Sequence, residues 1–417
     1  MQESRDVVVV GGGPAGLAAA EAVASQGVGV LVLERQSEIG YPIHTSGGSW
    51  MKEMQELGVP AQLLHPIPQV FFLSPRQEVA LRYDPPVACV LDVRGLYQHL
   101  AARAIAAGAE LRLRHAVDQV LLEEGRVSGV TVRDARGRRL TIRSRVTIDA
   151  SGMARHIAVR AGLAGAFRRY GYGAEYDLYA PHYPQEELYL LMGSKVAPSG
   201  YAWVFPRGQG RVRVGVGVIH PDSDDDARAY LDYLLHEEPR LRHKFRGASP
   251  LEYHTGLFPA EGPAERFSSA GLLLAGDAGG QGSTLVGEGI RFAIYAGRLA
   301  GQVAAEAVRQ GDVSATFLER FDRRWRARFG REMELAYLIN RHIAAYRDEQ
   351  WDEALILLRR LTPAQWAQAM RGEFTPGLLM GIMTRSPRLV ASGGRRLIER
   401  LLERLSQGAG AKPTDGR

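Results

Sequence analysis

The stretch of residues 7–35, VVVVGGGPAGLAAAEAVASQGVGVLVLER, decides the fold of this chain. The valines at 7–10 predict a buried parallel strand, the glycines after them predict a tight turn into a helix, and the apolar run at 28–33 predicts a second strand. This order is typical of the unit that binds the pyrophosphate of a dinucleotide. We therefore expect an α/β fold with a Rossmann-like domain at the N-terminus. The alternative is a glycine-rich turn that binds nothing.

The glycines of the pattern Gly11-x-Gly13-x-x-Gly16 are each expected to serve a separate purpose. Gly11 permits the tight turn, Gly13 has no side chain to keep a pyrophosphate off the backbone, and Gly16 lets the helix pack closely on the sheet. Pro14 and Ala15 start the helix, whose N-terminal N–H groups and positive dipole end attract phosphate. We expect these residues to form a phosphate-binding turn.

An acidic residue, Glu34, follows the second strand roughly 20 residues after the glycines, where a carboxylate can accept hydrogen bonds from a ribose diol. Its charge favours an adenosine ribose without a phosphate. Glu34 and the adjacent Arg35 are therefore predicted to contact the cofactor.

A second glycine-rich stretch, LLLAGDAGGQGSTLVGEGI at residues 272–290, begins with a short apolar strand at 272–275. It resembles the flavoprotein family of aromatic hydroxylases and its relatives. The resemblance implies that the cofactor is FAD, that Asp277 bonds the ribitol hydroxyls, and that the helix after Gly289 faces the flavin ring. The residues carried over from this stretch are Gly276, Asp277, Gly287, Gly289 and Ile290.

The same resemblance extends to the middle of the chain. The stretch DASG at 149–152 is similar to the family's Asp-Gly signature after a strand, and Arg94 lies in LDVRGLYQHL. The resemblance implies that Arg94 lies near the flavin and Val117 near the adenine. For Arg94, an ordinary solvated arginine at a helix start is the alternative.

A third stretch, YAWVFPRG at 201–208, resembles the YxWxFP motif of the geranylgeranyl reductases, which are FAD enzymes that saturate carbon–carbon double bonds of isoprenoid chains. Alternation places Tyr201, Trp203 and Phe205 on one face of a strand, and an aromatic face suits a long apolar substrate. The resemblance therefore makes these residues catalytic-site candidates. The alternative is that the rings form the core of a sheet.

One segment departs from that family. Its members commonly carry G-x-P-x-x-C, whereas this chain has GYPIHTSGG at 40–48, with Thr45 in the position of the cysteine. The resemblance implies that Thr45, Ser46 and Gly48 line the flavin ring and the substrate. Because Thr45 replaces the usual cysteine, the identity of the substrate and the number of double bonds reduced stay undetermined. His44 either donates a proton or bonds to the backbone.

The resemblance implies hydride transfer from flavin N5 to an alkene of an isoprenoid diphosphate or prenylated lipid, with Tyr201, His44 or a water as the proton donor. NAD(P)H, a ferredoxin or a quinol would reduce the flavin. Two other classes stay open. One is a monooxygenase or halogenase-like enzyme. Halogenases, however, carry a WxWxIP motif and a catalytic lysine, and no neighbouring residues mark Lys52 or Lys195 as catalytic. The other is a non-catalytic protein that binds flavin and prenyl lipid.

The motifs predict a discontinuous FAD-binding domain formed by residues 1–58, 92–165 and 262–310. Alternating segments in residues 59–91 and 166–261 predict an inserted, mostly antiparallel sheet that binds substrate. Residues 311–417 predict a C-terminal helical region with a frayed tail.

Composition agrees with a soluble enzyme of 417 residues, 45% hydrophobic, with a net charge of +6. No apolar run is long enough to span a membrane, and the first strand starts too early for a signal peptide, so we expect a cytoplasmic protein. The sole cysteine, Cys89, excludes an internal disulfide, and no metal-ligand spacing or nucleic-acid motif is found.

The last predicted helix has an apolar stripe surrounded by arginines. The stripe consists of Leu397, Ile398, Leu401, Leu402 and Leu405. Either it packs on the protein's own helices, or it lies on an anionic membrane as a peripheral contact.

Overall fold

The computed structural model describes residues 2–385 and 401–402. The chain forms two compact units. The first contains the residues up to 65 together with 88–172 and 254–330, and the second contains 66–87, 173–253 and the residues from 331 on. The three-part domain division expected from the sequence stays a prediction.

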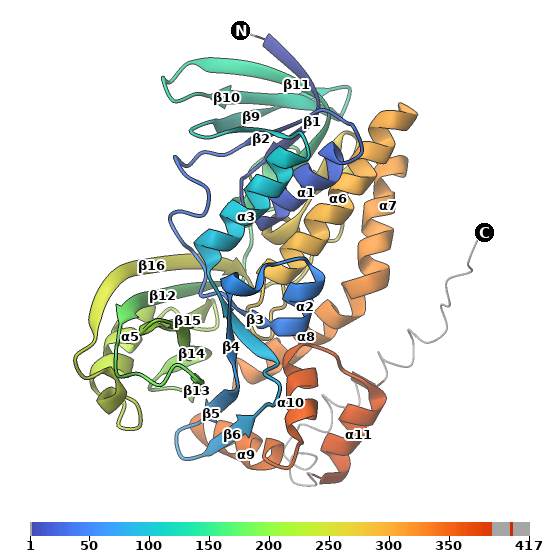
Figure 1. Ribbon diagram of the computed structural model, residues 1–417. Helices are drawn as coiled ribbons and strands as arrows, with labels where there is room; N and C mark the ends of the chain where they lie inside the picture. The colour runs from blue at the N-terminus through green and yellow to red at the C-terminus, as the bar shows by residue number, and fades with distance from the viewer. Residues whose placement is uncertain (1, 386–400, 403–417) are drawn as a thin grey trace. The chain divides into compact units, whose positions relative to one another are not determined.

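The first unit is built on a largely parallel sheet with the strand order β17-β18-β11-β1-β2-β8. Strands β11, β1 and β2 of this sheet are labelled in Figure 1. The strands of the sheet are β1 (Gln2–Val10), β2 (Val30–Leu33), β8 (Glu110–Arg112), β11 (Arg139–Asp149), β17 (Ser268–Ser269) and β18 (Leu272–Leu274). Strand β1 runs parallel to both β2 and β11, and β11 runs parallel to β18. Antiparallel strands β9 (Ala116–Glu123) and β10 (Arg126–Arg133) extend β11. The predicted βαβ unit is confirmed, with its second strand beginning at Val30 rather than Val28.

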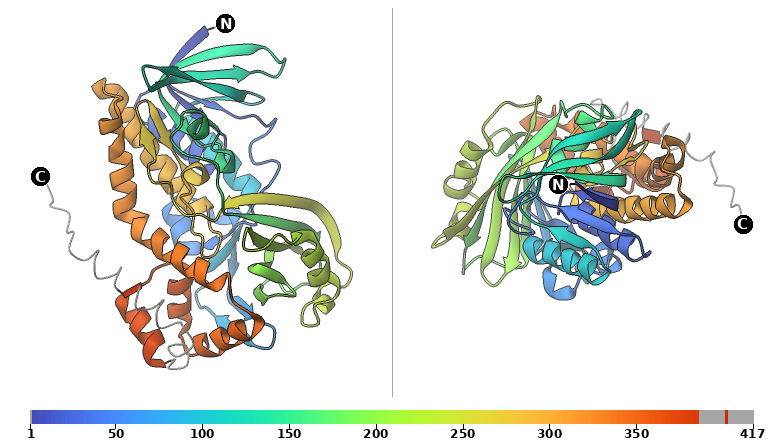
Figure 2. Two further views of the ribbon diagram at one scale, coloured as in Figure 1. Left: turned by 180° about the vertical axis from the view of Figure 1, so that it is seen from behind. Right: turned by 90° about the horizontal axis from the view of Figure 1, so that it is seen from above.

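Helices α1 (Pro14–Ala24), α3 (Val93–Ala106) and α6 (Ile290–Gln310) lie beside one another in the first unit (Figure 1). A Cβ atom on Gly297 of α6 would lie 2.1 Å from the carbonyl oxygen of Ala15, and glycine there lets α1 and α6 touch backbone to backbone. Helix α7 (Ala315–Trp325) packs along α6 (Figure 2). The shorter helices are α2 (Met51–Glu56), α4 (His156–Arg160), the 3-10 turns η1 (Ala61–Leu63), η2 (Gly152–Ala154) and η4 (Gly276–Gly279), and the π-turn η5 (Arg326–Gly330).

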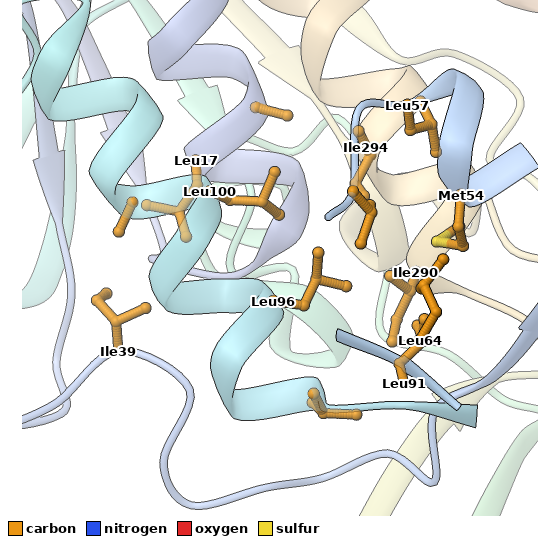
Figure 3. Packing of buried hydrophobic residues seen from close by; sticks show 14 of the residues in the cluster. Leu17, Ile39, Met54, Leu57, Leu64, Leu91, Leu96, Leu100, Ile290 and Ile294 are labelled. Carbon is orange, nitrogen blue, oxygen red and sulfur yellow. The ribbon is translucent and has the colours of Figure 1, made fainter. Parts of the chain in front are cut away.

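A hydrophobic core lies between helices α1, α3 and α6 (Figure 3). Leu17 of α1, Leu96 and Leu100 of α3, and Ile290 and Ile294 of α6 are all buried in it. Because the core includes Ile290, the first residue of α6, it fixes where that helix begins.

The second unit contains most of a seven-stranded sheet with the order β16-β12-β15-β14-β13-β5-β6. The strands are β5 (Gln69–Leu73), β6 (Glu78–Arg82), β12 (Tyr170–Tyr179), β13 (Glu187–Gly193), β14 (Ala197–Gly208), β15 (Arg211–His220) and β16 (Ser249–Pro259). Strand β14 pairs antiparallel with β13 and β15, whereas β13 and β5 are parallel. The predicted inserted sheet is therefore confirmed, with one parallel pair. A small sheet contains β3 (Gly48–Trp50), β4 (Leu64–Ile67) and β7 (Ala88–Leu91).

Helices α5 (Ala227–His236), α8 (Arg331–Ile343), α9 (Asp348–Leu358), α10 (Pro363–Met370) and α11 (Pro376–Arg385) belong to the second unit, with the 3-10 turn η3 (Arg242–Phe245). Leu401 is buried against Leu335 and Leu379, and Leu402 packs on the same cluster. The prediction that the last apolar stripe packs on the protein's own helices is confirmed for these two residues. Leu397, Ile398 and Leu405 lie outside the described residues. Over the described part of the chain, no helix combines the length and apolarity that a membrane span requires.

Candidate cofactor site

The carboxyl ends of four parallel strands bring the sequence motifs of the first unit to one edge of its sheet. Val10 lies opposite both Leu33 and Asp149, and Asp149 lies opposite Leu274. Backbone hydrogen bonds continue past the strand ends, since Ala150 N donates to Val10 O and Ala275 N to Asp149 O, each at 2.9 Å. The loops after these strands therefore leave the sheet side by side, which is where ligands bind in open α/β sheets.

The glycine turn is shaped as the sequence predicts. Gly11 has a φ of +111°, and a Cβ atom there would lie 2.3 Å from Ala150 O, while one on Gly16 would lie 2.0 Å from Gly11 O. A Cβ atom on Gly13 would meet no atom within 4 Å. Gly13 also precedes α1 without a side-chain cap on the helix N-terminus. The turn thus leaves open space directly before uncapped N–H groups, which suits a phosphate.

Glu34 is anchored next to this turn. Its Oε2 accepts a hydrogen bond from Gly12 N at 2.6 Å, and its Oε1 accepts one from Gln36 N at 2.8 Å. Each oxygen keeps a further lone pair, so the predicted ribose contact is compatible with this arrangement. His115 N donates to Glu34 O at 2.8 Å, which brings the start of β9 and the half-buried Val117 alongside. Arg35 is exposed.

Asp149 builds the neighbouring loop with both of its carboxylate oxygens. Oδ1 accepts from the backbone N and hydroxyl of Ser151, and Oδ2 accepts from the N–H groups of Ile157 and Ala158 at 3.0 and 2.8 Å. The side chain is fully buried and caps the start of α4. We therefore interpret Asp149 as a residue that fixes the loop.

Asp277, unlike Asp149, has no hydrogen-bond donor among the described residues. Its side chain accepts no hydrogen bond from the described residues, and loss of hydration in the packed loop raises its pKa from 3.8 to about 6. A Cβ atom on Gly289, just before α6, would lie 3.5 Å from its Oδ1. A carboxylate that has lost hydration and has no protein donor is suited to accept hydrogen bonds from the hydroxyls of a ligand.

Three further polar groups in the same loop are buried and have no hydrogen-bond partner among the described residues. They are Nε2 of Gln281, Oγ of Ser283 and Oγ1 of Thr284. Buried polar groups are normally satisfied, so their clustering beside Asp277 indicates a polar ligand. The donor and acceptor set of this edge therefore fits a dinucleotide that carries a polyol chain.

The segment at 44–50 is held at both ends within the first unit. His44 Nδ1 donates to Thr255 O at 2.9 Å, and a Cβ atom on Gly256 would lie 2.3 Å from His44 O. The backbone-bonding alternative for His44 is the one that the structure shows. Thr45 and Ser46 are half-buried.

The other end of that segment is fastened by Glu288, which the sequence analysis did not assign. Its carboxylate accepts from Ser49 Oγ at 3.2 Å and Trp50 Nε1 at 3.1 Å. It also accepts from Nε and Nη2 of Arg291 at 3.1 and 2.9 Å. These bonds join Ser49 and Trp50, next to the predicted flavin contacts Thr45, Ser46 and Gly48, to the start of α6, which the resemblance places at the flavin ring. An acid between two glycines, with an arginine three residues later, is the only local signal in the sequence that could have drawn attention to Glu288.

Arg155 is a second residue that the sequence analysis missed. It is buried, although its backbone is left-handed with a φ of 43°. Nε donates to Ala278 O at 2.8 Å and Nη1 to Gly165 O at 3.1 Å, and burial lowers the pKa of the guanidinium to about 10. Arg155 thus connects the loop after β11 with the loop that carries Asp277.

Arg94 starts α3 after the cap Asp92 and forms an ion pair with Glu38 at 2.5 Å. Its side chain is 48% exposed, which favours the alternative of a solvated arginine at a helix start. Its contact with the flavin stays a prediction.

The aromatic residues of β14 share one face, as alternation predicts. The ring centroids of Tyr201 and Trp203 lie 5.6 Å apart, and those of Trp203 and Phe205 lie 6.2 Å apart. Trp203 Nε1 donates to Glu175 Oε2 at 3.0 Å. Opposite Trp203 on β15 is Gly215, where a Cβ atom would lie 2.3 Å from the indole ring. A hydrogen bond on one side and a glycine beneath it therefore set the position of Trp203.

Beyond Phe205, the same strand carries Arg207, which belongs to a cluster of charged side chains. Asp177, fully buried, accepts hydrogen bonds from Arg207 and from Arg211 Nε at 3.0 Å, and Arg213 Nε lies 3.5 Å from its Oδ2. The aromatic row therefore ends in a buried ionic cluster beside Phe205.

Comparison with known proteins now decides the family. Residues 6–179 match the model for FAD dependent oxidoreductases, and residues 171–256 match the geranylgeranyl reductase catalytic domain. The chain is 32% identical over 392 residues to digeranylgeranylglycerophospholipid reductase 2 of Methanopyrus kandleri, covering 92% of this chain and 97% of that protein. The chain belongs to the geranylgeranyl reductase family of FAD-dependent oxidoreductases.

Further members and structures agree with this assignment. The reductase of the same name from Methanothermobacter thermautotrophicus is 35% identical over 364 residues, covering 84% of this chain and 90% of that protein. A geranylgeranyl bacteriochlorophyll reductase-like structure from Thermoplasma acidophilum superimposes with a TM-score of 0.85 at 25% identity, covering 96% of this chain and all of that one. A flavin-dependent brominase has a TM-score of 0.67 at 17% identity, which shows a shared fold alone. The predicted fold, family and enzyme class are confirmed.

Proposed function

We propose that this chain is an FAD-dependent reductase that saturates carbon–carbon double bonds of geranylgeranyl chains on a glycerophospholipid. The observation that carries the proposal is the likeness, over nearly the whole chain, to reductases named for that lipid class. The aromatic strand at 201–208 lies within the residues that match the catalytic domain.

The residues at the edge of the first sheet fit FAD. We propose that the turn at 11–16 binds the pyrophosphate, that Glu34 binds the adenosine ribose, and that Asp277 accepts hydrogen bonds from the ribityl hydroxyls. Support comes from the open space at Gly13 and from the lack of donors to Asp277 among the described residues. When bound and reduced, the flavin supplies the hydride that alkene reduction requires.

The aromatic row of the second unit suits the substrate chain. Tyr201, Trp203 and Phe205 form a row of adjacent rings, of which Trp203 and Phe205 are buried and Tyr201 is half-buried. We propose that this apolar row lies along the isoprenoid, whose methyl-substituted alkenes are apolar and flat. Because Glu175 and Gly215 fix Trp203, the row is preorganised to align the chain rather than adapt to it.

The second hydrogen reaches the alkene as a proton. We propose Tyr201 as the donor, because it is the first residue of the aromatic motif and, of Tyr201, Trp203 and Phe205, the one that carries a hydroxyl. His44 is a weaker candidate, because its Nδ1 is already bonded to Thr255 O. A Tyr201→Phe variant should reduce its flavin normally but saturate the lipid more slowly.

The physiological setting follows from the substrate class. A prenylated glycerophospholipid resides in a bilayer, so we propose that the protein meets it at the cytoplasmic membrane surface as a peripheral protein. NAD(P)H, a ferredoxin or a quinol is proposed to reduce the flavin.

An anaerobic single-turnover experiment tests the proposal. The purified FAD-loaded protein is reduced with dithionite and mixed with a digeranylgeranylglycerophospholipid, while flavin absorbance and product mass are followed. Flavin reoxidation with a gain of two hydrogens per saturated bond is the expected result. If the flavin stays reduced until oxygen is admitted and the lipid is unchanged, the reductase proposal fails and an oxygen-using enzyme becomes the one to test.

A further inference from the structure

We propose that Glu288 is a positioning residue that fixes the relative position of two segments of the flavin site, residues 45–50 and 287–291. The inference rests on the proposed function, because the resemblance places both segments at the flavin ring. It goes beyond that function by assigning the alignment of the site to one buried carboxylate.

The carboxylate of Glu288 has its acceptor capacity filled from two distant parts of the chain. Ser49 and Trp50 donate from β3, and Arg291 donates twice from the first turn of α6. Glu288 is 7% exposed and Arg291 is 5% exposed. Hydrogen bonds to a charged acceptor in such surroundings are stronger than those between neutral groups, so the carboxylate acts as a firm tether.

The backbone of Glu288 is fixed as well. Ser283 N donates to Glu288 O at 2.9 Å, and a Cβ atom on Gly282 would lie 3.3 Å from that oxygen. The side chain therefore cannot follow a displaced Trp50 without moving the loop at 282–289. That loop also contains the buried hydroxyls of Ser283 and Thr284, which have no hydrogen-bond partner among the described residues, so a displacement of the loop would move these hydroxyls as well.

The tethered strand is short. Strand β3 contains only residues 48–50 and pairs with β7, with Ser49 opposite Cys89. Two of those three residues, Ser49 and Trp50, bond to Glu288. A strand this short has few ladder hydrogen bonds, so the side-chain tether decides its position relative to α6.

The test compares Glu288→Gln with the wild type and with Glu56→Gln. The glutamine that replaces Glu288 keeps the size of the side chain but has one acceptor oxygen and no charge. Glu56 is an acid at the end of the neighbouring helix α2, and its carboxylate lies 3.8 Å from Lys52 Nζ, a residue of that same helix. Its variant therefore controls for the loss of a nearby negative charge.

For Glu288→Gln we expect FAD affinity within about threefold of wild type, because the pyrophosphate and ribityl contacts lie elsewhere. The absorbance spectrum of the bound flavin should shift, and kcat for the lipid should fall by about 10- to 100-fold with KM nearly unchanged, since a displacement of about 1 Å at a reacting site has that effect. Glu56→Gln should leave the spectrum and kcat as in the wild type.

A wild-type flavin spectrum and a wild-type kcat in Glu288→Gln would overturn the proposal. If that variant fails to fold or to bind FAD, Trp50→Phe provides the second test, since it removes one N–H donor and leaves the Glu288–Arg291 pair in place. A shifted flavin spectrum in Trp50→Phe supports the tether, and an unchanged one refutes it. The spectral measurements need no lipid, so they stay decisive even if the lipid reductase proposal fails.

Discussion

Replacing Asp277 with asparagine is expected to stabilise the protein without FAD and to weaken its binding of FAD. The carboxylate accepts no hydrogen bond from the described residues, and burial raises its pKa from 3.8 to about 6. In the absence of the cofactor the ionised side chain is therefore a net cost to the folded state. Asparagine has nearly the same shape and carries no charge.

The magnitude follows from the shift in pKa. The difference between about 6 and 3.8 is about 2.2 units, and at 1.36 kcal/mol per unit this is up to about 3 kcal/mol. Because the folded-state pKa lies above the unfolded value, the folded apoprotein holds the extra proton between those two pH values. The contribution of Asp277 to the stability of the apoprotein is therefore largest below pH 3.8 and is lost as pH rises to about 6.

Cofactor binding should respond in the opposite direction. In the proposed site, hydroxyl donors from the ribityl chain would stabilise the ionised carboxylate of Asp277, and a hydrogen bond to a charged group contributes about 1.5–3 kcal/mol. FAD affinity of the wild type should therefore rise as pH increases through about 6. Asp277→Asn should lose about 10- to 100-fold in affinity at neutral pH and show little pH dependence.

Denaturant unfolding of the apoprotein and FAD titration by fluorescence quenching, each across pH 4–8, measure both effects. Asp149→Asn is the matched control, since it changes a neighbouring buried carboxylate that already has its donors. The reasoning is refuted if apo Asp277→Asn is less stable than the wild type at neutral pH. It is also refuted if wild-type FAD affinity does not change between pH 5 and 7.

Further substitutions test other contacts. Asp149→Asn should lower the free energy of unfolding by about 2–4 kcal/mol, because buried N–H groups at the start of α4 lose a charged acceptor; denaturant unfolding measures this. Gly13→Ala should leave apoprotein stability within about 0.5 kcal/mol but abolish FAD binding, because its Cβ meets no protein atom and would occupy the phosphate space. Gly16→Ala should instead destabilise the apoprotein by about 2 kcal/mol or more, since its Cβ would lie 2.0 Å from Gly11 O. Gly215→Ala should displace the Trp203 ring and raise KM for the lipid several-fold with FAD affinity unchanged; equal KM values would contradict the assigned role of that strand.

Much of the fold could be predicted because its signals are local. The glycine turn, the run of valines and the alternation in YAWVFPRG each fix backbone conformation or side-chain direction over a few residues. The structure shows the expected strands at 7–10 and 201–205, and α6 begins at Ile290 as expected. Motif resemblance then identified the family before any contact was known.

The polar contacts of the site could not be predicted from local sequence patterns. Glu288 reaches Ser49 and Trp50 across more than 200 residues of sequence, and Arg155 reaches Ala278 across more than 100. No periodicity encodes which donor meets which acceptor, because that depends on how strands from different parts of the chain are ordered in the sheet. Asp149, the last residue of β11, accepts hydrogen bonds from groups two to nine residues further along the chain, whereas Asp277, three residues after the end of β18, accepts none from the described residues.

The sequence by itself therefore determined the class of fold, the family and the turn that can accept a phosphate, because backbone conformation and hydrophobic periodicity are local properties. Only the tertiary structure decided which carboxylates are structural and which are open to a ligand. Burial, and contacts such as those of Glu288 with Ser49 and Trp50, are set by atoms that are distant in sequence and adjacent only after folding.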